Sequence, residues 1–359
     1  MTRLRQSERP PVGPLVSFGK LEQILGRDRV SLRRFAGHAG RYYRPFDRRR
    51  QSGTGKWRHI DNPTDELKEL QRRIEVRILN RLLLPETMMG AVNGRSIRGN
   101  AGCHLGQSML VALDLRACFP RTSDMKVFKV YREKVGCSTE IASLLTKLTT
   151  FQGRLPQGAP TSATLANFTL LPLHADIELL MASRELQFTF WVDDIVFSGP
   201  HAEEAIEPVI RLVHKHGHSL RRQKILVMPN SEPQRVTGVG VNRHVSALNE
   251  RRHAIRQRIF ELVTRESIAD HELRSLRGSI ENVKWLSPLQ GLVLERLAER
   301  FLPEVGAEGA RPRTDETRPC NNPRRHRWAV TRPQVQRSRS IPEHSKDGTG
   351  QRPAHLIAP

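Results

Sequence analysis

The chain has 359 residues, 37% of them hydrophobic, which is enough for one large or two medium domains with a proper core. Its formal net charge of +22 exceeds what solubility needs and indicates a polyanionic partner, which composition leaves open as RNA, DNA or an anionic membrane. No run of about 20 apolar residues occurs, so no membrane-spanning helix is expected, and the N-terminal residues lack the apolar core of a signal peptide.

The N-terminal part of the chain is basic. Residues 1–20 begin with a stretch rich in Pro and Arg, and we expect them to be poorly ordered. Over residues 21–35 the apolar positions recur at helical spacing. The segment 41–50 mixes arginines with aromatic residues, a composition that suits a nucleic-acid backbone with stacked bases. A plain solvated basic face is the alternative interpretation.

The next two segments continue this basic character. Residues 56–63 predict a short strand running into a turn, and Thr64 can cap the amphipathic helix that follows. The segment 90–108 is rich in glycine and contains Arg95 and Arg98. Glycines beside arginines allow backbone amides and guanidinium groups to approach a phosphate chain. A flexible loop with solvated arginines has the same composition.

A strand of the buried type, residues 109–115, contains Asp114 near its end. A charge at the end of an apolar strand is costly unless it is paired or coordinated, so Asp114 is a candidate metal ligand. We then expect helical structure over 122–149, a Gly- and Pro-rich loop over 151–162 and a helix over 162–183.

Two adjacent acids, Asp193 and Asp194, lie between apolar and aromatic residues. Such flanks predict two strands joined by a tight hairpin. Asp is a common turn former, so a surface turn is the simple interpretation of any Asp-Asp pair. Acids on a buried hairpin, however, need a strong partner, most simply a divalent metal.

The rest of the chain becomes helical and then irregular. After the hairpin we expect a helix, a strand and a strand pair, over residues 202–217, 224–228 and 234–242. Residues 249–301 show a basic helical pattern. Over 303–359 Pro, Arg, Ser and Gly dominate and apolar periodicity vanishes, which predicts a disordered basic tail.

The order of these elements resembles a polymerase palm, and five short motifs match one family. The segment Trp191-Val192-Asp193-Asp194 resembles the YxDD box of reverse transcriptases, residues 155–162 look like their LPQGxPTS loop, and residues 111–120 look like the strand with their first aspartate. Asn100-Ala101-x-x-His104 and Val236-Thr237-Gly238 are similar to the NAxxH and VTG signatures of bacterial retron reverse transcriptases. The resemblance runs from about residue 20 to residue 302.

This resemblance implies an α+β fold of the right-hand polymerase type. Fingers and palm, an antiparallel sheet plus helices, would occupy residues 21–245, and a helical thumb would occupy residues 246–302. The four cysteines show no metal-binding spacing and fit reduced thiols in a cytoplasmic bacterial protein.

Nucleotide addition needs a nucleophilic 3′-hydroxyl and a neutralised pyrophosphate leaving group, and two Mg²⁺ ions about 4 Å apart supply both. The acids placed on a strand end and a tight hairpin are Asp114, Asp193 and Asp194, and we assign them as the catalytic metal ligands. The resemblance adds the backbone carbonyl of Leu115 as a further ligand.

The resemblance also implies roles around the metal site. Phe119 matches the aromatic gate that would clash with a ribose 2′-hydroxyl, and Lys224 matches a lysine near the leaving pyrophosphate. Taken alone, Phe119 fits a core residue and Lys224 a solvated strand residue. The implied nucleotide-binding set comprises Arg95, Arg98, Phe119, Gln157, Gly158 and Lys224.

A second set is implied to bind RNA or the primer. Its Val236 to Gly238 segment looks like a primer-holding hairpin, and the basic thumb would track the template–primer duplex. His104 is equally well explained as a hydrogen-bonded loop histidine. Trp191 replaces the usual Tyr or Phe of the box and places a bulkier ring near the primer end. The implied set comprises Asn100, His104, Trp191, Val236, Thr237 and Gly238.

The resemblance therefore implies an RNA-directed DNA polymerase of the retron type. It would use deoxynucleoside triphosphates and a structured non-coding RNA, starting from an RNA 2′-hydroxyl to make branched RNA–DNA. It further implies a role in bacterial defence against phage with an effector protein, and no membrane partner. Two alternatives remain open: another bacterial reverse transcriptase, such as a group II intron-like one, and a catalytically silent RNA-binding protein on a polymerase scaffold.

Overall fold

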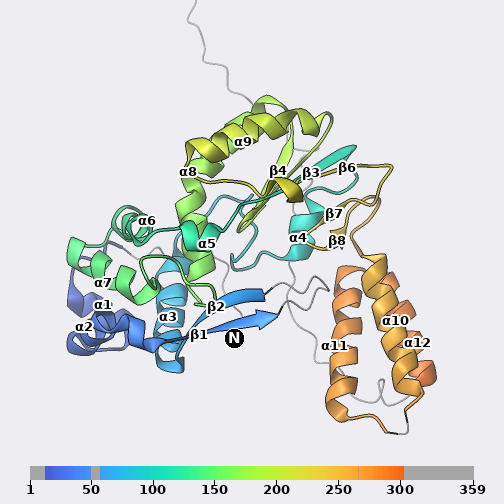
Figure 1. Ribbon diagram of the computed structural model, residues 1–359, viewed down its shortest axis with the longest axis horizontal. Coiled ribbons are helices and arrows are strands. Elements are labelled where there is room, and N and C mark those ends of the chain that lie inside the picture. The colour runs from blue at the N-terminus through green and yellow to red at the C-terminus, as the bar shows by residue number, and fades with distance from the viewer. Residues whose placement is uncertain (1–12, 50–56, 266, 303–359) are drawn as a thin grey trace, which may run out of the picture. The chain divides into compact units, whose positions relative to one another are not determined.

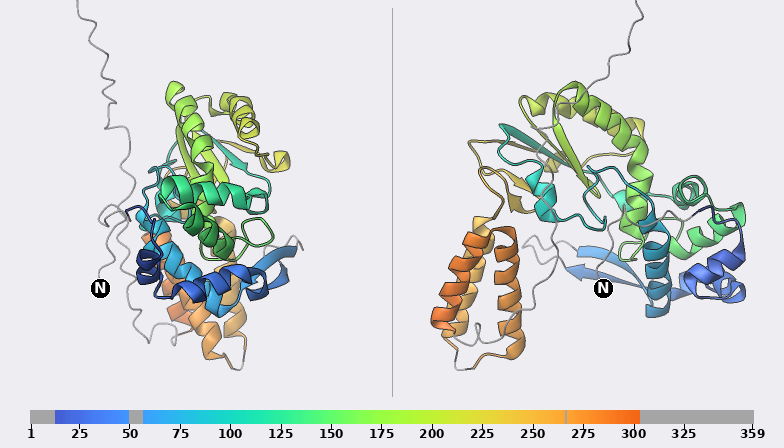
Figure 2. Two further views of the ribbon diagram at one scale, coloured as in Figure 1. Left: turned by 90° about the vertical axis from the view of Figure 1, so that its left-hand side faces the viewer. Right: turned by 180° about the vertical axis from the view of Figure 1, so that it is seen from behind.

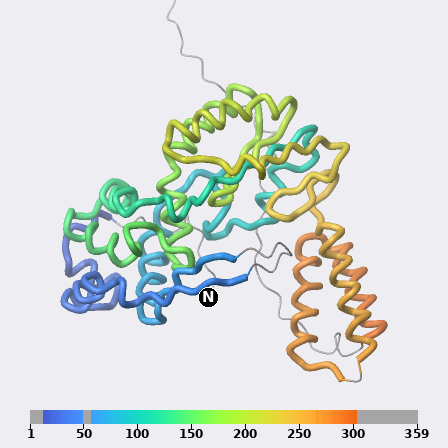
Figure 3. Tube along the Cα trace, viewed as in Figure 1, coloured from blue at the N-terminus to red at the C-terminus, as the bar shows by residue number. Residues whose placement is uncertain are grey.

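The computed structural model describes residues 13–49, 57–265 and 267–302. The expected basic tail over 303–359 and the first twelve residues lie outside the described residues. The described chain contains both helices and antiparallel strands, and its path can be followed in Figure 3. Within these ranges, none of the helices is long and apolar enough to cross a membrane.

The N-terminal helices α1 (Phe18–Leu25) and α2 (Arg29–Gly37) replace the single helix expected over residues 21–35. Gly26 ends α1 because its φ of 62° is left-handed, and the Asp28 side chain accepts a hydrogen bond from the Ser31 N–H at the start of α2. Order also begins before residue 20, which corrects the expectation for that stretch. The Leu15 side chain is fully buried, and its carbonyl accepts a hydrogen bond from the Ser138 N–H.

Strands β1 (Tyr43–Arg49) and β2 (Trp57–Pro63) pair as an antiparallel two-stranded ribbon (Figure 1). Helix α3 (Asp65–Arg77) follows. Two acidic residues in its first turn interact favourably with the positive end of the helix dipole. Thr64 occupies the N-cap position, but its side chain makes no capping hydrogen bond. The helix ends earlier than its apolar pattern suggests and continues as a 3₁₀ turn over Leu79–Arg81.

The central sheet contains β3 (Met109–Asp114), β4 (Gln187–Trp191), β5 (Asp194–Ser198) and β6 (Leu226–Pro229), in the order β4-β5-β3-β6 with antiparallel neighbours. The Asp-Asp hairpin and the strand ending at Asp114 are thus confirmed. Helices α8 (Ser162–Ser183) and α9 (Ile206–Lys215) pack side by side next to these strands (Figure 1). The bounds of α8 agree with the sequence-based expectation.

The helical segment expected over 122–149 is interrupted. It comprises α6 (Asp124–Lys129), one π-helical turn (Val130–Lys134) and α7 (Thr139–Thr149), and the short helix α5 (Cys118–Arg121) precedes it. The break follows from Gly136, whose φ is 74°, and from Ser138, which caps α7 through the Ile141 N–H. The glycine-rich segment 90–108, expected as a loop, contains α4 (Ile97–Gly102), capped by Ser96.

The C-terminal part of the described chain is a small sheet followed by a helical bundle. Strands β7 (Arg235–Val236), β8 (Val239–Gly240) and β9 (Ser246–Ala247) precede α10 (Asn249–Val263), α11 (Asp270–Leu286) and α12 (Pro288–Phe301). The three helices contact one another and lie side by side in the right-hand view of Figure 2. Gly291 allows α12 to approach α11 closely, because a Cβ there would lie 2.2 Å from the Lys284 Cα.

Candidate active site

The pairing of β3 with β5 brings three aspartates together. Asp114 lies opposite Asp194 in the antiparallel register, and the Leu115 N–H donates to the Asp193 carbonyl over 2.8 Å. On the other side of β5, Trp191 lies opposite Asp194. Residues about eighty positions apart in the sequence therefore meet at one end of the sheet, as expected for the candidate metal ligands.

The turn that carries Asp193 is strained and supported from behind. Val192 has a φ of 57°, in the left-handed region that β-branched residues rarely adopt. Gly90 lies directly against this turn, because a Cβ at that position would be 2.7 Å from the Val192 N. The Met89 N–H donates to the Phe190 carbonyl over 2.7 Å, and Asn167 Nδ2 donates to the Gly90 carbonyl over the same distance. The glycine-rich sequence of residues 90–108 indicated a loop here. It did not indicate that this loop packs behind the turn.

The electrostatics of the cluster favour an external cation. Burial, followed by the negative charges of Asp193 and Asp114, raises the pKa of Asp194 to about 7. Burial also raises the pKa of Asp193. Crowded carboxylates of this kind are stabilised by a hard divalent ion, whose preferred ligands are carboxylate and carbonyl oxygens.

The donor set around the turn is incomplete without main-chain or substrate oxygens. Among the described residues, no group of three His, Cys, Asp or Glu side chains is arranged to hold a metal by itself. Mg²⁺ usually keeps only one or two carboxylates and completes its octahedron with water and substrate phosphates. The aspartates present therefore fit a metal that binds together with a nucleotide.

Two cations partly neutralise Asp114. Lys224 Nζ lies 2.6 Å from Asp114 Oδ2, and Arg221 Nε lies 3.3 Å from Asp114 Oδ1. The main chain fixes this arrangement, since the Arg221 N–H donates to the Asp114 carbonyl over 2.9 Å. Sequence reasoning placed Lys224 near the site. It missed Arg221, which no motif distinguished from the other arginines.

The loop that contains Gln157 and Gly158 packs on β2. Arg58 Nε donates to Gln157 Oε1 over 3.2 Å. Gly158 has a φ of 127°, and a Cβ there would approach Ile60 Cγ2 to 3.0 Å, so this position favours glycine. Arg58 was not expected in the site, although its neighbourhood of arginines and aromatic residues was a signal for a ligand surface.

Arg95 and Arg98 both donate hydrogen bonds to main-chain carbonyls. Arg95 donates to the carbonyls of Leu84 and Met88 over 3.0 and 2.6 Å, so its guanidinium holds the loop behind the Val192 turn. Arg98 is exposed and donates to the Trp285 carbonyl of α11 over 3.1 Å. These contacts correct the expectation for Arg95, whose guanidinium binds main-chain oxygens of the fold. The triphosphate contact expected for Arg98 stays a prediction.

His104 is likewise part of the fold. It has no exposed surface, and its ring nitrogens lie 2.7 Å from Ser198 Oγ and 2.9 Å from Thr189 Oγ1. Burial lowers the pKa of His104 to about 3, so the ring is neutral. A direct contact with RNA is therefore incompatible with this arrangement, and the alternative of a hydrogen-bonded histidine is the correct one.

The remaining expected RNA- or primer-binding residues lie around a second turn. Asn100 is buried and its Nδ2 lies 3.4 Å from Thr237 Oγ1. Val236 is buried, and Thr237 and Gly238, with φ of 48° and 76°, form the turn between β7 and β8. The segment Asn100 to His104 thus packs between this turn and the central sheet.

Phe119 and Trp191 are half-buried. Phe119 belongs to α5, which begins directly after Ala117, a residue with a left-handed φ of 53°. This bend turns the chain away from β3 three residues after Asp114. The roles expected for Phe119 and Trp191 stay predictions.

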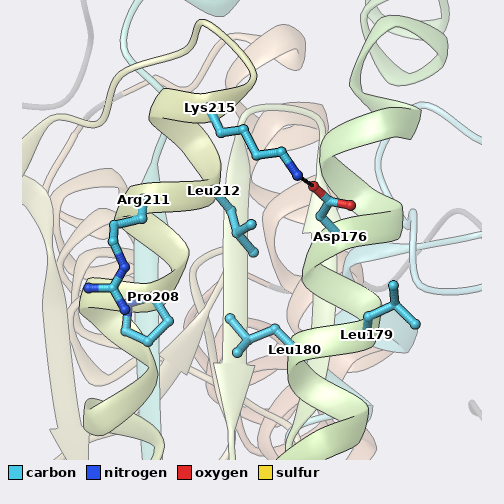
Figure 4. A pocket seen from close by; sticks show the side chains of 7 residues that line it. All are labelled: Asp176, Leu179, Leu180, Pro208, Arg211, Leu212 and Lys215. Carbon is cyan, nitrogen blue, oxygen red and sulfur yellow. Dashed lines mark hydrogen bonds and ion pairs between the residues drawn. The ribbon is translucent and has the colours of Figure 1, made fainter. Parts of the chain in front are cut away.

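A surface groove of about 400 Å³ lies between α8 and α9 (Figure 4). Leu179, Leu180 and Leu212 line it, and the Lys215–Asp176 ion pair, 2.8 Å long, crosses its upper part. The three clustered aspartates do not contribute to its lining. The groove is therefore distinct from the candidate active site.

Comparison with known proteins agrees with this geometry. The family model described as reverse transcriptase (RNA-dependent DNA polymerase) matches residues 48–241. The Retron Mx65 reverse transcriptase of Myxococcus xanthus is 31% identical over 73% of this chain, and the match spans 65% of that protein's length. The Retron Ec86 reverse transcriptase of Escherichia coli is 28% identical over 79% of this chain and 86% of its own.

A further relative is the Retron Se72 reverse transcriptase of Salmonella heidelberg, 26% identical over 81% of this chain and 80% of its own. Among solved structures, a telomerase from Candida albicans in complex with a telomeric RNA fragment aligns over 74% of this chain and 59% of its own. Its identity is 9% and its TM-score is 0.37, which is too low to support an argument.

Proposed function

The chain belongs to the reverse transcriptase (RNA-dependent DNA polymerase) family, and we propose that it is an RNA-directed DNA polymerase of the retron type. The observation that carries this proposal is the meeting of Asp114 with the Asp193–Asp194 turn at one end of the central sheet. The matches to three retron reverse transcriptases support the narrower assignment.

In this proposal the three aspartates and the Leu115 carbonyl hold two Mg²⁺ ions. When bound, the ions supply a more nucleophilic hydroxyl and neutralise charge on the pyrophosphate. Lys224, already beside Asp114, lies where it can bind the leaving pyrophosphate and donate a proton to it. Gln157 and Gly158 line the incoming nucleotide, and Phe119 excludes a ribose 2′-hydroxyl.

The proposed architecture is that of fingers, palm and thumb. The central sheet with α8 and α9 is the palm, the β1–β2 ribbon belongs to the fingers, and α10–α12 form the thumb. Phe46 and Trp57 on the ribbon are exposed among arginines, which suits stacking on unpaired bases. Exposed arginines on the bundle, such as Arg251 and Arg274, suit a duplex backbone. Trp191 and the turn residues Thr237 and Gly238 hold the primer end, while Val236 is buried and only supports the turn.

The proposed substrates are deoxynucleoside triphosphates and a structured non-coding RNA that serves as template and primer. Synthesis starts from an RNA 2′-hydroxyl and leaves a branched RNA–DNA product. A role in antiphage defence with an effector protein completes the proposal. These features are carried over from the retron type that the relatives' names give, and the net charge of +22 is consistent with an RNA partner.

The test is primer extension on a primed RNA template with Mg²⁺ and deoxynucleotides. The wild-type chain should make DNA, and Asp193→Asn combined with Asp194→Asn should abolish synthesis while RNA binding, measured by gel shift, survives. Synthesis by the double variant would show that the metal site is wrongly assigned. No product from the wild-type chain, with RNA still bound, would favour a silent RNA-binding protein.

A further inference from the structure

Asp61 is a charged residue with no exposed surface, at the contact between β2 and the loop 154–158. Burying a carboxylate is costly unless it is paired and hydrogen-bonded. Arg154 supplies the pair: its Nη1 lies 2.8 Å from Asp61 Oδ2, and its Nη2 lies 3.4 Å from Asp61 Oδ1. This two-point contact pairs the opposite charges and also fixes the orientation of the carboxylate relative to the guanidinium.

The main chain of the same loop is bound to Asp61 as well. The Asp61 N–H donates to the Gln157 carbonyl over 2.8 Å, and the Gln157 N–H donates to Asp61 Oδ2 over 3.2 Å. Asp61 therefore holds both ends of the segment from Arg154 to Gln157. Gly158, which follows directly, is pressed against the backbone of Asp61 and the side chain of Ile60.

The contact continues into β1 through His59. Its Nε2 lies 3.4 Å from Asp61 Oδ1, and its Nδ1 lies 2.9 Å from Asp47 Oδ1 on the paired strand. The β1–β2 ribbon and the loop 154–158 are thus joined by one set of polar contacts, and Asp61 is its buried centre.

We propose that Asp61 is a positioning residue, which with Arg154 sets the depth at which Gln157 and Gly158 meet the incoming nucleotide. This inference rests on the proposed function. Asp61 has no surface with which to touch RNA or nucleotide, so it acts only through the loop. Its loss would displace the nucleotide-binding wall and leave the template–primer surfaces in place. Losing contact with the bound nucleotide weakens its binding in the ground state and the transition state alike, which raises KM and leaves kcat largely unchanged.

Two variants and a matched control test the proposal. Asp61→Ala removes the contacts, and Asp61→Asn keeps an oxygen that can accept from Arg154 and from the Gln157 N–H. Glu69→Gln is the control, because it removes the negative charge from the Arg73–Glu69 pair on α3, a contact of 3.1 Å in which Glu69 is exposed. Each variant is assayed for deoxynucleotide KM, kcat and template–primer affinity, and for hydrogen exchange in the peptide covering residues 154–162.

We expect Asp61→Ala to raise KM about tenfold or more, to change kcat and template–primer affinity much less, and to speed exchange in the loop. Asp61→Asn should shift KM in the same direction by less, and Glu69→Gln should change nothing. Unchanged KM in a folded Asp61→Ala, or an equal shift in the control, would overturn the proposal.

The two proposals can fail separately. If the wild-type chain makes no DNA, the proposed function falls, and exchange in the loop still decides whether Asp61 orders it. Unchanged exchange would overturn the positioning role whatever the activity. If Asp61→Ala does not fold, Asp61→Asn carries both measurements with the same signs.

Discussion

Polar residues fill two neighbouring regions of this molecule and are used in opposite ways. At the hairpin turn, Asp193 and Asp194 lie beside Asp114, and burial, followed by the nearby negative charges, raises the pKa of both turn aspartates. In the segment from Arg95 to His104, the cationic and imidazole groups bind carbonyls and hydroxyls of the fold. One region has an excess of like charge, and the other finds its partners inside the protein.

This difference separates ligand sites from scaffold. A carboxylate cluster that is only partly neutralised is stabilised by a cation from outside, whereas a buried polar group with internal partners has little to offer a ligand. The two regions also touch, since Arg95 holds the loop that carries Gly90 behind the turn. The scaffold segment thereby supports the site without belonging to it.

Gly90→Ala should have the largest effect on activity, and it tests whether the scaffold segment supports the aspartate turn. The added methyl group would lie 2.7 Å from the Val192 N and would push the turn out of place. We expect primer extension to fall by about a hundredfold or more while RNA binding persists. The matched control is Gly102→Ala in α4, where a Cβ meets nothing within 4 Å. Equal activity of the two variants would contradict the support that Gly90 gives to the turn.

A smaller effect is expected at Phe119, which belongs to α5 and follows Asp114 by five residues in the sequence. Phe119→Ala should admit ribonucleotides and reduce the discrimination between deoxynucleotides and ribonucleotides by about tenfold or more. Competition between the two substrates in single-nucleotide extension measures the ratio. If sugar selectivity is unchanged, Phe119 is a core residue of α5 and not a gate.

The smallest expected effect is a change in the pH dependence of folding stability, caused by His104 in the scaffold region. Burial lowers the pKa of His104 from 6.5 to about 3, so the unfolded chain binds a proton at a pH where the folded chain does not. The stability linked to this residue is complete above pH 6.5 and is lost as pH falls from 6.5 toward 3. The stability of His104→Gln should therefore depend less on pH in this window. The variant should also be less stable at neutral pH, because the contacts of the ring with Ser198 and Thr189 are disturbed.

Urea unfolding between pH 7 and pH 5 measures this slope. His253→Gln, at an exposed position of α10, is the control and should retain the wild-type slope. An unchanged slope in His104→Gln would contradict the buried, neutral imidazole. Loss of RNA binding without loss of stability would instead restore a direct RNA role for His104.

Short-range signals in the sequence were sufficient for much of the fold and for part of the site. The bounds of α8, the Asp-Asp hairpin and the strand of Asp114 follow from local periodicity and flanking residues. The break between α1 and α2 was missed because Gly26 lies within a continuous apolar pattern. Thr64 was named as a cap by its residue type, but its hydroxyl is buried and makes no hydrogen bond.

The residues that sequence reasoning misplaced share one property, which is dependence on distant partners. Arg95 looks like a phosphate ligand until the carbonyls that accept its hydrogen bonds are known. Asp61, Arg221 and Gly90 carry no motif, and their importance depends on contacts with residues about 90 or more positions away. Local sequence cannot reveal such pairs, because an acid, an arginine or a loop glycine that has no distant partner can have the same neighbours in the chain.

The most direct test of the central claim counts the metal ions. Mn²⁺ binding is measured by electron paramagnetic resonance on the chain with a template and a primer that lacks its 3′-hydroxyl, plus the matching deoxynucleotide. If Asp114, Asp193 and Asp194 hold a metal pair, the wild-type complex binds about two ions, and Asp193→Asn with Asp194→Asn loses them. Equal Mn²⁺ binding by the two proteins would contradict the account.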